Sequence, residues 1–354
     1  MPIELSRRTF NRNLAALPLA ATSCATETAA PAAGRPWHHT AAGFRNPPGS
    51  APRGGDFEDW SSFFLRRFTR RERPAVPAGH VLPQDEVAAG LQRHRGADSL
   101  TWLGHASFLI RLDGRTILTD PFLSEHASPL PPFGPERFAP PGLTPGQLPP
   151  IDILLLSHNH YDHLDLPTIE ALPAKERIQV VAPLRLGRYF ASRAFTSVHE
   201  LDWHDQVTVA GIAVTGLPAI HFSKRTLFDR DETLWGGYAV ESSRRRLHFA
   251  GDTGYGPIFP ELGRNGRPFD VALLPIGAYE PRLLMGAVHV NPEEAVQIAR
   301  DLNAKRVVAM HWGTIELTDE PPFEPPERFR TAARAAGYGD DQTWILRIGE
   351  TRAL

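Results

Sequence analysis

Short apolar runs of strand length dominate the chain from residue 99 onward. The segments "SLTWLGHASFLIRL" and "RTILTDP" are joined by Asp113-Gly114, and Asp-Gly between alternating apolar residues predicts a hairpin turn. The continuous apolar run "IDILLLS" is typical of a strand that is covered on both faces. Further strands are predicted in "IQVVAP", "VTVAGIAVTGLPAI", "YAVES", "RLHFAGDTG", "FDVALLPIG" and "AKRVVAMHWG".

Helical periodicity is clearest in "NPEEAVQIARDL". Asn291 can cap this helix, and Ala295, Ile298 and Ala299 share one of its faces. Strands outnumber helices, and polar motifs repeatedly follow the strands. The pattern therefore predicts a single α/β catalytic domain over residues 99–354.

The first 24 residues have features of an export signal. The segment "SRRTF", which begins at Ser6, resembles a twin-arginine signal, and the apolar stretch Leu14–Ala21 is too short to span a bilayer. The segment "LAATSC" resembles a lipoprotein processing box that would leave Cys24 lipidated. We expect export to the periplasm or anchoring to a membrane as a lipoprotein, with no transmembrane helix in the mature chain. The alternative is a frayed tail on a cytoplasmic protein.

Two more segments precede the predicted domain. Residues 25–55 are rich in Ala, Pro and Gly and are expected to form a flexible linker. Residues 56–98 form an N-terminal extension in which aromatic residues recur at helical spacing beside arginines. These residues are Trp60, Phe63, Phe64 and Phe68 with Arg66, Arg67, Arg70, Arg71 and Arg73. Such a basic aromatic helix can lie on an anionic lipid surface; alternatively, its aromatics dock on the domain and its arginines are solvated.

Composition narrows the chemistry that is available. The chain has 354 residues and a formal net charge of −2, so its overall charge favours no nucleic-acid partner. Its one cysteine, Cys24, lies in the signal segment, which leaves the domain without a disulfide or a thiolate ligand. A metal site in this domain must therefore consist of His, Asp or Glu side chains.

Such side chains crowd the segment "SHNHYDHLD" directly after the run "IDILLL". In a regular strand His158 and His160 would share a face and His163 would point away, whereas a loop lets them converge with Asp162. Histidine is the commonest metal ligand among the side chains, so this spacing predicts a metal site.

Three distant residues could complete this site. His221 follows the apolar run "GLPAI", Asp252 follows "LHFAG", and His311 follows "RVVAM". Each of them alone would more often have a structural role. Their shared position after predicted strands favours a common site with the histidine-rich loop.

The order of these motifs resembles the metallo-β-lactamase superfamily, and within it the N-acylphosphatidylethanolamine-hydrolysing phospholipase D family. The resemblance runs from about Leu100 to Gly313. It is carried by "TWLGHASF", "ILTDPFLSEHASP", "LPPID", "SHNHYDHLD", "KRTLFDRDETLWGGYAV", "FAGDTGYGPIF", "PFDVALLPIGAYEPR", "HVNPEEAV" and "MHWGT". It implies a four-layer αβ/βα sandwich of the metallo-β-lactamase type.

The resemblance also implies a ligand set for two zinc ions, although His and Asp ligands also suit iron or manganese. One ion would be held by His158, His160 and His221. The other would be held by Asp162, His163 and His311, and Asp252 would bridge the two.

Three more residues match the family's motifs. Asp120 matches a carboxylate that orients a ligand imidazole; alternatively, it caps the turn before Pro121. His289 matches a histidine near the substrate phosphate, where it could donate a proton or a hydrogen bond; alternatively, it covers a helix start. Tyr161 could contact substrate or pack beside the metal ions.

By this resemblance the activity is hydrolysis of a phospholipid phosphodiester by a metal-bridged hydroxide, which releases an N-acylethanolamine and phosphatidic acid. An apolar rim formed by Phe122, Leu123, Leu130 and Phe133 would favour work at a membrane surface. Two alternatives stay open. One is a metal-dependent hydrolase of a lactone, a β-lactam or a water-soluble phosphodiester, and the other is a non-catalytic metal- or lipid-binding lipoprotein. No feature of the sequence indicates an oligomeric state.

Overall fold

The structure is a computed structural model that describes residues 34–69 and 73–354. The predicted export signal and the lipidation site at Cys24 lie outside the described residues. Within the described ranges, no helix combines the length and the hydropathy needed to cross a bilayer.

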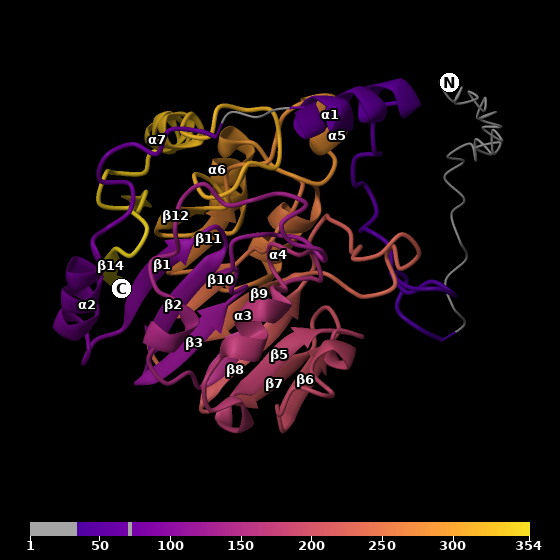
Figure 1. The fold of residues 1–354 in the computed structure, drawn as a ribbon. Helices are drawn as coiled ribbons and strands as arrows, with labels where there is room; N and C mark the ends of the chain where they lie inside the picture. Colours follow the sequence, from indigo (N-terminus) through magenta and orange to yellow (C-terminus); the bar gives the residue numbers. More distant parts are fainter. Residues whose placement is uncertain (1–33, 70–72) are drawn as a thin grey trace, which may run out of the picture.

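Two mixed seven-stranded sheets form the centre of the fold (Figure 1). The first sheet has the order β14-β1-β2-β3-β4-β5-β6, and the second has the order β13-β12-β11-β10-β9-β8-β7. The strands of the first are β1 (Ser99–Gly104), β2 (Ser107–Leu112), β3 (Arg115–Thr119), β4 (Ile153–Leu155), β5 (Gln179–Pro183), β6 (Ser197–Leu201) and β14 (Thr351–Ala353). The strands of the second are β7 (Gln206–Val209), β8 (Ile212–Leu217), β9 (Gly237–Glu241), β10 (Arg246–Phe249), β11 (Val271–Pro275), β12 (Val307–Met310) and β13 (Thr343–Trp344).

Helices flank the two sheets, which gives the four-layer αβ/βα arrangement (Figure 1). They are α1 (Phe57–Thr69), α2 (Gln84–Arg93), α3 (Leu166–Ala171), α4 (Ile258–Asn265), α5 (Arg282–Met285), α6 (Pro292–Asp301) and α7 (Pro325–Ala335). Helix α6 contacts α4, α7 and β11, whereas α2 contacts β14 at the edge of the first sheet. The α/β sandwich expected from the sequence is thus confirmed.

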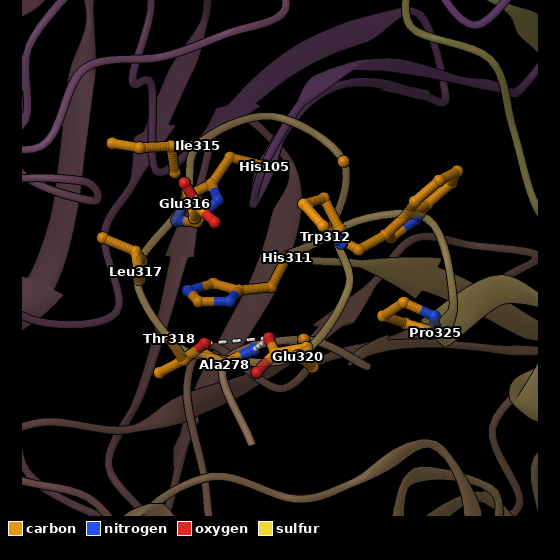
Figure 2. A pocket seen from close by; sticks show the side chains of 13 residues that line it. His105, Ala278, His311, Trp312, Ile315, Glu316, Leu317, Thr318, Glu320 and Pro325 are labelled. Atoms are coloured by element: carbon orange, nitrogen blue, oxygen red, sulfur yellow. Dashed lines mark hydrogen bonds between the residues drawn. The ribbon is translucent and has the colours of Figure 1, made fainter. Parts of the chain in front are cut away.

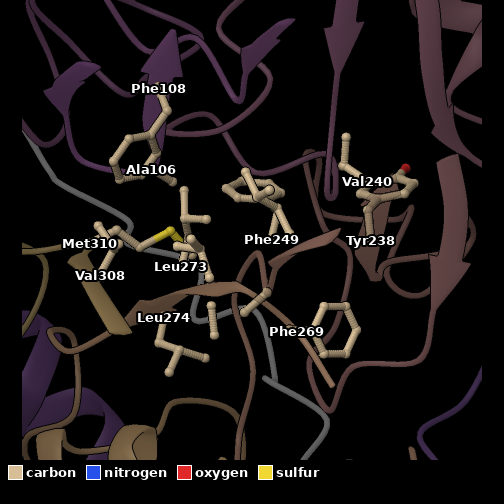
Figure 3. Packing of buried hydrophobic residues seen from close by; sticks show 14 of the residues in the cluster. Ala106, Phe108, Tyr238, Val240, Phe249, Phe269, Leu273, Leu274, Val308 and Met310 are labelled. Atoms are coloured by element: carbon tan, nitrogen blue, oxygen red, sulfur yellow. The ribbon is translucent and has the colours of Figure 1, made fainter. Parts of the chain in front are cut away.

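The main hydrophobic core joins side chains of both sheets. Figure 3 shows Phe108 of the first sheet packed with Phe249 and Leu273 of the second, and all three are completely buried. Full burial of a large apolar side chain contributes about 1.5–3 kcal/mol, so this contact region is a major source of stability.

Local signals in the sequence predicted two features of this framework correctly. Strands β2 and β3 pair antiparallel around Asp113 and Gly114, which have φ values of 47° and 77°. Positive φ at both central residues is what a tight hairpin turn requires. Asn291 caps α6, where its side chain accepts a hydrogen bond from the Glu294 N–H at 2.8 Å.

The segment before α1 differs from the linker that its composition suggests. Residues 36–53, called here the N-terminal strap, contain little regular structure but pack against the domain. His38, His39 and Phe44 are all buried there. Composition missed this because a few specific contacts, and not an extended apolar pattern, hold the strap.

Helix α1 confirms that part of its aromatic face docks on the domain. Figure 1 shows α1 beside α5. Trp60 and Phe63 of α1 pack there on Leu284 and Met285 of α5. Phe64 is 61% exposed. The arginines of α1 contact the protein as well: Arg66 pairs with Asp319, and Arg67 donates to the carbonyl of Thr318.

Candidate metal centre

The predicted site residues come together at one edge of the two sheets. Strands β3, β4 and β5 run parallel, as do β10, β11 and β12, so the carboxyl ends within each set share an edge. The loop after β4 carries the motif "SHNHYDH", and the turns after β10 and β12 carry Asp252 and His311. His221 follows β8 after three residues without strand pairing.

The first cluster consists of His158, His160, His221 and Asp252. His160 Nδ1 lies 2.8 Å from His158 Nε2 and 3.3 Å from His221 Nε2. Three imidazole nitrogens and a carboxylate thus converge on one point, which is a donor set that suits a transition metal ion.

The second cluster consists of His105, Asp162, His163 and His311. Asp162 Oδ2 lies 3.5 Å from His163 Nε2 and 3.6 Å from His311 Nε2. This set also combines imidazole nitrogen with carboxylate oxygen.

Asp252 belongs to the first cluster and also faces the second. Its Oδ2 is 3.2 Å from His163 Nε2 and 3.8 Å from His221 Nε2, and its Oδ1 is 3.2 Å from His311 Nε2. One carboxylate therefore faces donors of each cluster, as the sequence-based assignment of a bridging ligand requires.

The donor atoms have the properties of a binding site and not of a closed polar network. His163 Nε2, His311 Nε2 and Asp252 Oδ1 are buried and make no hydrogen bond. An unsatisfied buried polar group costs about 1–3 kcal/mol, so three at one point need a partner. Metal ions fit this requirement because they accept lone pairs from all three atoms at once.

A hydrogen-bond chain orients the imidazoles from outside. His163 Nδ1 donates to Asp120 Oδ2 at 2.7 Å, and Asp120 also accepts from Ser157 Oγ at 2.5 Å. Ser157 Oγ in turn accepts from His158 Nδ1 at 2.8 Å. His221 Nδ1 donates to the Val288 carbonyl at 2.9 Å. In each ring Nδ1 is thus committed outside the cluster, and Nε2 faces the cluster.

The electrostatics of the site favour cations. Burial lowers the pKa of His160 and of His221 to about 3, so both rings are neutral. Burial would raise the pKa of Asp252, but His163 and His311 hold it well below its usual value. Burial would likewise lower the pKa of His311, but Asp252 raises it to about 9. The carboxylates thus stay ionised inside the protein, where they attract a cation.

His105 is a member of the site that the sequence analysis did not assign. Its Nε2 donates to Asp162 Oδ2 at 2.8 Å, and its ring centroid lies 3.9 Å from that of His311. Figure 2 shows these two rings side by side, with Glu320 below them accepting from Thr318 and the Ala278 N–H. The sequence predicted one strand over "SLTWLGHASFLIRL", whereas the structure divides it into β1 and β2 with His105 at the turn between them, where its φ is 55°.

His289 and Tyr161 flank the clusters. His289 Nδ1 is buried, makes no hydrogen bond and lies 4.0 Å from Asp252 Oδ2. The Tyr161 hydroxyl donates to the Arg225 carbonyl at 2.8 Å, and the Arg225 guanidinium lies 4.0 Å from the Tyr161 ring. Both residues are therefore beside the site, with the imidazole of His289 uncommitted and the hydroxyl of Tyr161 already in use.

The apolar rim differs in part from the prediction. Phe122 is completely buried and Leu123 is 7% exposed, so neither belongs to the rim. Phe122 fails as a rim residue because the turn after β3 directs it into a small core with Ala127 and Ile315.

Other apolar side chains on this part of the surface are exposed. Leu130 is 70% exposed and Phe133 is 76% exposed, as the sequence suggested. Leu227 and Phe228 are 81% and 90% exposed, and they line a groove together with His160. A second groove joins Phe64 of α1 to Phe133. Leu227 and Phe228 thus border the first cluster at His160, whereas the groove of Phe64 and Phe133 contains no residue of either cluster.

Comparison with known proteins gives a consistent result. The family model described as "Beta-lactamase superfamily domain" matches residues 115–312. The chain is 40% identical over 269 residues to an uncharacterized protein of Mycobacterium tuberculosis. The aligned region covers 74% of this chain and 69% of that one. It is 36% identical over 262 residues to N-acyl-phosphatidylethanolamine-hydrolyzing phospholipase D 1 of Caenorhabditis elegans. The aligned region covers 71% of this chain and 74% of that one. It is 33% identical over 272 residues to a metal-dependent hydrolase of Rubrobacter xylanophilus. The aligned region covers 73% of this chain and 98% of that one.

Solved structures agree with the fold. A possible metal-dependent hydrolase from Veillonella parvula superposes with a TM-score of 0.58 at 15% identity, over 73% of this chain and 100% of that one. The metallo hydrolase Igni18 from Ignicoccus hospitalis gives a TM-score of 0.55 at 21% identity, over 73% of this chain and 98% of that one. At these identities the likeness establishes the architecture alone.

Proposed function

Since the chain belongs to the metallo-β-lactamase superfamily and its metal-dependent hydrolases, we propose that it is a dinuclear-zinc phosphodiesterase of the phospholipase D type. Its proposed substrate is an N-acylphosphatidylethanolamine-type phospholipid at a membrane surface. The observation that carries the proposal is the pair of adjoining donor clusters that share Asp252.

The residues divide into two ligand sets. His158 Nε2, His160 Nδ1 and His221 Nε2 would hold one ion. Asp162, His163 and His311 would hold the other, and Asp252 would contact both. Metal ions bound there supply a water of lowered pKa and neutralise charge on phosphoryl oxygens.

Hydrolysis of the diester forms a bond between a water oxygen and phosphorus and breaks the bond from phosphorus to the ethanolamine oxygen. His289, whose Nδ1 lies 4.0 Å from Asp252 Oδ2, would donate a hydrogen bond to a phosphoryl oxygen. Burial lowers the pKa of His289 to about 3, so its ring is neutral at physiological pH and carries one N–H. In this proposal His289 is a hydrogen-bond donor that orients the phosphate, and the attacking water releases the proton that the leaving oxygen takes up.

A lipid substrate is supported by the surface beside the clusters. Isolated exposed apolar side chains are common, but Leu227 and Phe228 are neighbours in a groove that also contains His160. Side chains of this kind insert into the boundary between headgroups and acyl chains. A substrate dissolved in water would not need them.

The test of this proposal is product analysis. The full chain, loaded with zinc, is incubated with mixed micelles of N-acylphosphatidylethanolamine, and the products are identified by mass spectrometry. We expect phosphatidic acid and N-acylethanolamine in equal amounts, and we expect both to disappear when a chelator is added.

The matched control is His160→Ala, which removes one donor of the first cluster. Loss of both metal and product in this variant supports the ligand assignment. If the metal-loaded wild type forms neither product but opens a lactone, a β-lactam or a water-soluble diester, then the lipid substrate is wrong and the hydrolase assignment stands. If it hydrolyses none of these, the protein is a metal-binding protein without this activity.

A further inference from the structure

The N-terminal strap, residues 36–53, lies outside the segment matched by the family model and still reaches the metal-site residue His221. In Figure 1 this indigo segment runs beside the loop that follows β8. Two groups of contacts hold it there, one distant from the metal site and one at its edge.

The distant contact is a carboxylate held between two imidazoles. His38 Nε2 and His39 Nε2 donate to the two oxygens of Asp202, each at 2.6 Å, and the His38 ring stacks on Trp203 with centroids 4.3 Å apart. Each imidazole nitrogen meets its own oxygen of Asp202 at a length that suits a charge-assisted hydrogen bond, so these residues act as an anchor for the strap.

The contact at the metal site is made by Asn46. Its Nδ2 donates to the His221 carbonyl at 2.8 Å, and its Oδ1 accepts from the His221 N–H at 2.9 Å. The same oxygen accepts from Trp235 Nε1 at 3.1 Å. His221 lies beyond the paired part of β8, so one side chain from the strap provides both of the backbone hydrogen bonds that a neighbouring strand would otherwise provide.

The strap also contacts the residues that follow His221. The Phe44 N–H donates to the Asp231 carbonyl at 2.9 Å, and the Arg53 guanidinium lies 3.9 Å from the centre of the Phe222 ring. The Phe222 ring in turn packs edge-on against His160, with centroids 4.5 Å apart. The strap therefore contacts both the backbone of His221 and the Phe222 ring that packs on His160.

We propose that the N-terminal strap is a brace for the first cluster, in which Asn46 is the positioning residue for His221 and the contact of His38 and His39 with Asp202 is the anchor. The two hydrogen bonds fix the backbone of His221, while the bond from its Nδ1 to Val288 fixes the ring. Together they aim Nε2 at the cluster before an ion arrives. The proposal rests on the assignment of His221 as a metal ligand.

The experiment compares metal binding by full-length wild type, Asn46→Ala and Ser50→Ala. Ser50 is a matched control because its hydroxyl bonds only within the strap, to the Pro47 carbonyl at 2.7 Å. Zinc affinity is measured by competition with a chromogenic chelator, and the cobalt-substituted proteins are compared by visible absorption. Loss of an outer contact of a metal ligand typically costs about 10–100-fold in affinity. We expect a loss of this size for one equivalent in Asn46→Ala together with a changed cobalt spectrum, and wild-type behaviour in Ser50→Ala.

Two further variants make every outcome decisive. Asn46→Asp keeps the acceptor for the His221 N–H but loses the donor, so we expect an intermediate affinity; it also replaces Asn46→Ala if that variant does not fold. His221→Ala separates the two proposals: if it retains both equivalents of metal, the ligand assignment is wrong. If His221→Ala loses metal while both Asn46 variants bind like Ser50→Ala, the brace is wrong and the ligand assignment stands.

Discussion

His105 Nε2 donates to Asp162 Oδ2 at 2.8 Å, while the ring of His105 lies against the ring of His311 with centroids 3.9 Å apart. One buried side chain thus contacts two members of the second cluster at once. No residue of the first cluster makes a corresponding contact with His105 among the described hydrogen bonds and ring pairs. The second cluster therefore depends on His105 more than the first does.

We predict that His105→Ala weakens metal binding at the second cluster selectively. Asp162 would lose the donor that fixes its carboxylate, and His311 would lose the ring that packs on it. The expected loss is about 10–100-fold in affinity for one equivalent, with the other equivalent unchanged. Isothermal titration of the metal-free protein with zinc measures both equivalents.

Two variants control for the loss of a buried histidine. His105→Gln can still donate to Asp162 and should recover part of the affinity. His248→Gln changes another buried histidine, one that packs on Phe269 and belongs to neither cluster, and should bind both ions normally. Equal weakening of both equivalents in His105→Ala would contradict the selective role.

The exposed pair Leu227 and Phe228 gives a prediction about membranes. Their side chains are 81% and 90% exposed beside the groove that contains His160. Burial of one such side chain contributes about 1.5 kcal/mol or more, which is roughly tenfold in a binding constant. We expect the double variant Leu227→Ser, Phe228→Ser to bind anionic phospholipid vesicles at least about tenfold more weakly in a sedimentation assay.

Hydrolysis of a water-soluble phosphodiester is the control for this variant. Such a substrate needs no bilayer, so the double variant should hydrolyse it at the wild-type rate. If the double variant loses hydrolysis of the soluble diester as well as vesicle binding, the loop serves the active site itself and not the membrane.

The elements that the sequence predicted well share a local cause. The hairpin at Asp113-Gly114 and the cap at Asn291 are determined by a few neighbouring residues, and both appear in the structure as expected. The approach of Asp252 to His311 was also predictable, because each follows a strand of one parallel set and the carboxyl ends of parallel strands share an edge.

The features that the sequence did not reveal depend on distant contacts. Asn46 bonds a residue 175 positions later, and His105 bonds Asp162 across 57 positions. Nothing in the neighbourhood of either residue indicates its partner. Phe122 was misplaced for a related reason, since an apolar residue after a strand can face a rim or a core and only the packed neighbours decide.

The anchor of the strap predicts a pH-dependent stability. Burial would raise the pKa of Asp202 above its ordinary value of 3.8, but the hydrogen bonds from His38 and His39 lower it. A carboxyl whose pKa is lower in the folded chain stabilises the fold above its unfolded pKa, and this contribution is lost as the pH falls through the folded pKa. We expect Asp202→Asn to be less stable than wild type by about 1.5–3 kcal/mol near pH 6, the usual range for hydrogen bonds to a charged group.

Urea unfolding of both proteins at several pH values measures this difference. It should stay constant between about pH 5 and 7 and shrink below about pH 4, where the carboxyl of the unfolded wild type becomes protonated. A difference that is equally large at about pH 3 would show that the charge of Asp202 is not what holds the strap.

His289 allows a test that separates orientation of the phosphate from proton transfer. Burial lowers its pKa to about 3, and its Nδ1 lies 4.0 Å from Asp252 Oδ2 without making a hydrogen bond. Removal of one donor to a reacting group typically costs about 10²–10³ in kcat, so we expect a loss of this size in His289→Ala with metal content unchanged. Because the ring is neutral throughout the range from about pH 5 to 9, the pH profile of kcat/KM should keep its shape in the variant while its height falls. If the acidic or basic limb of the profile disappears in His289→Ala instead, then His289 transfers a proton during the reaction, and its role as a neutral donor is wrong.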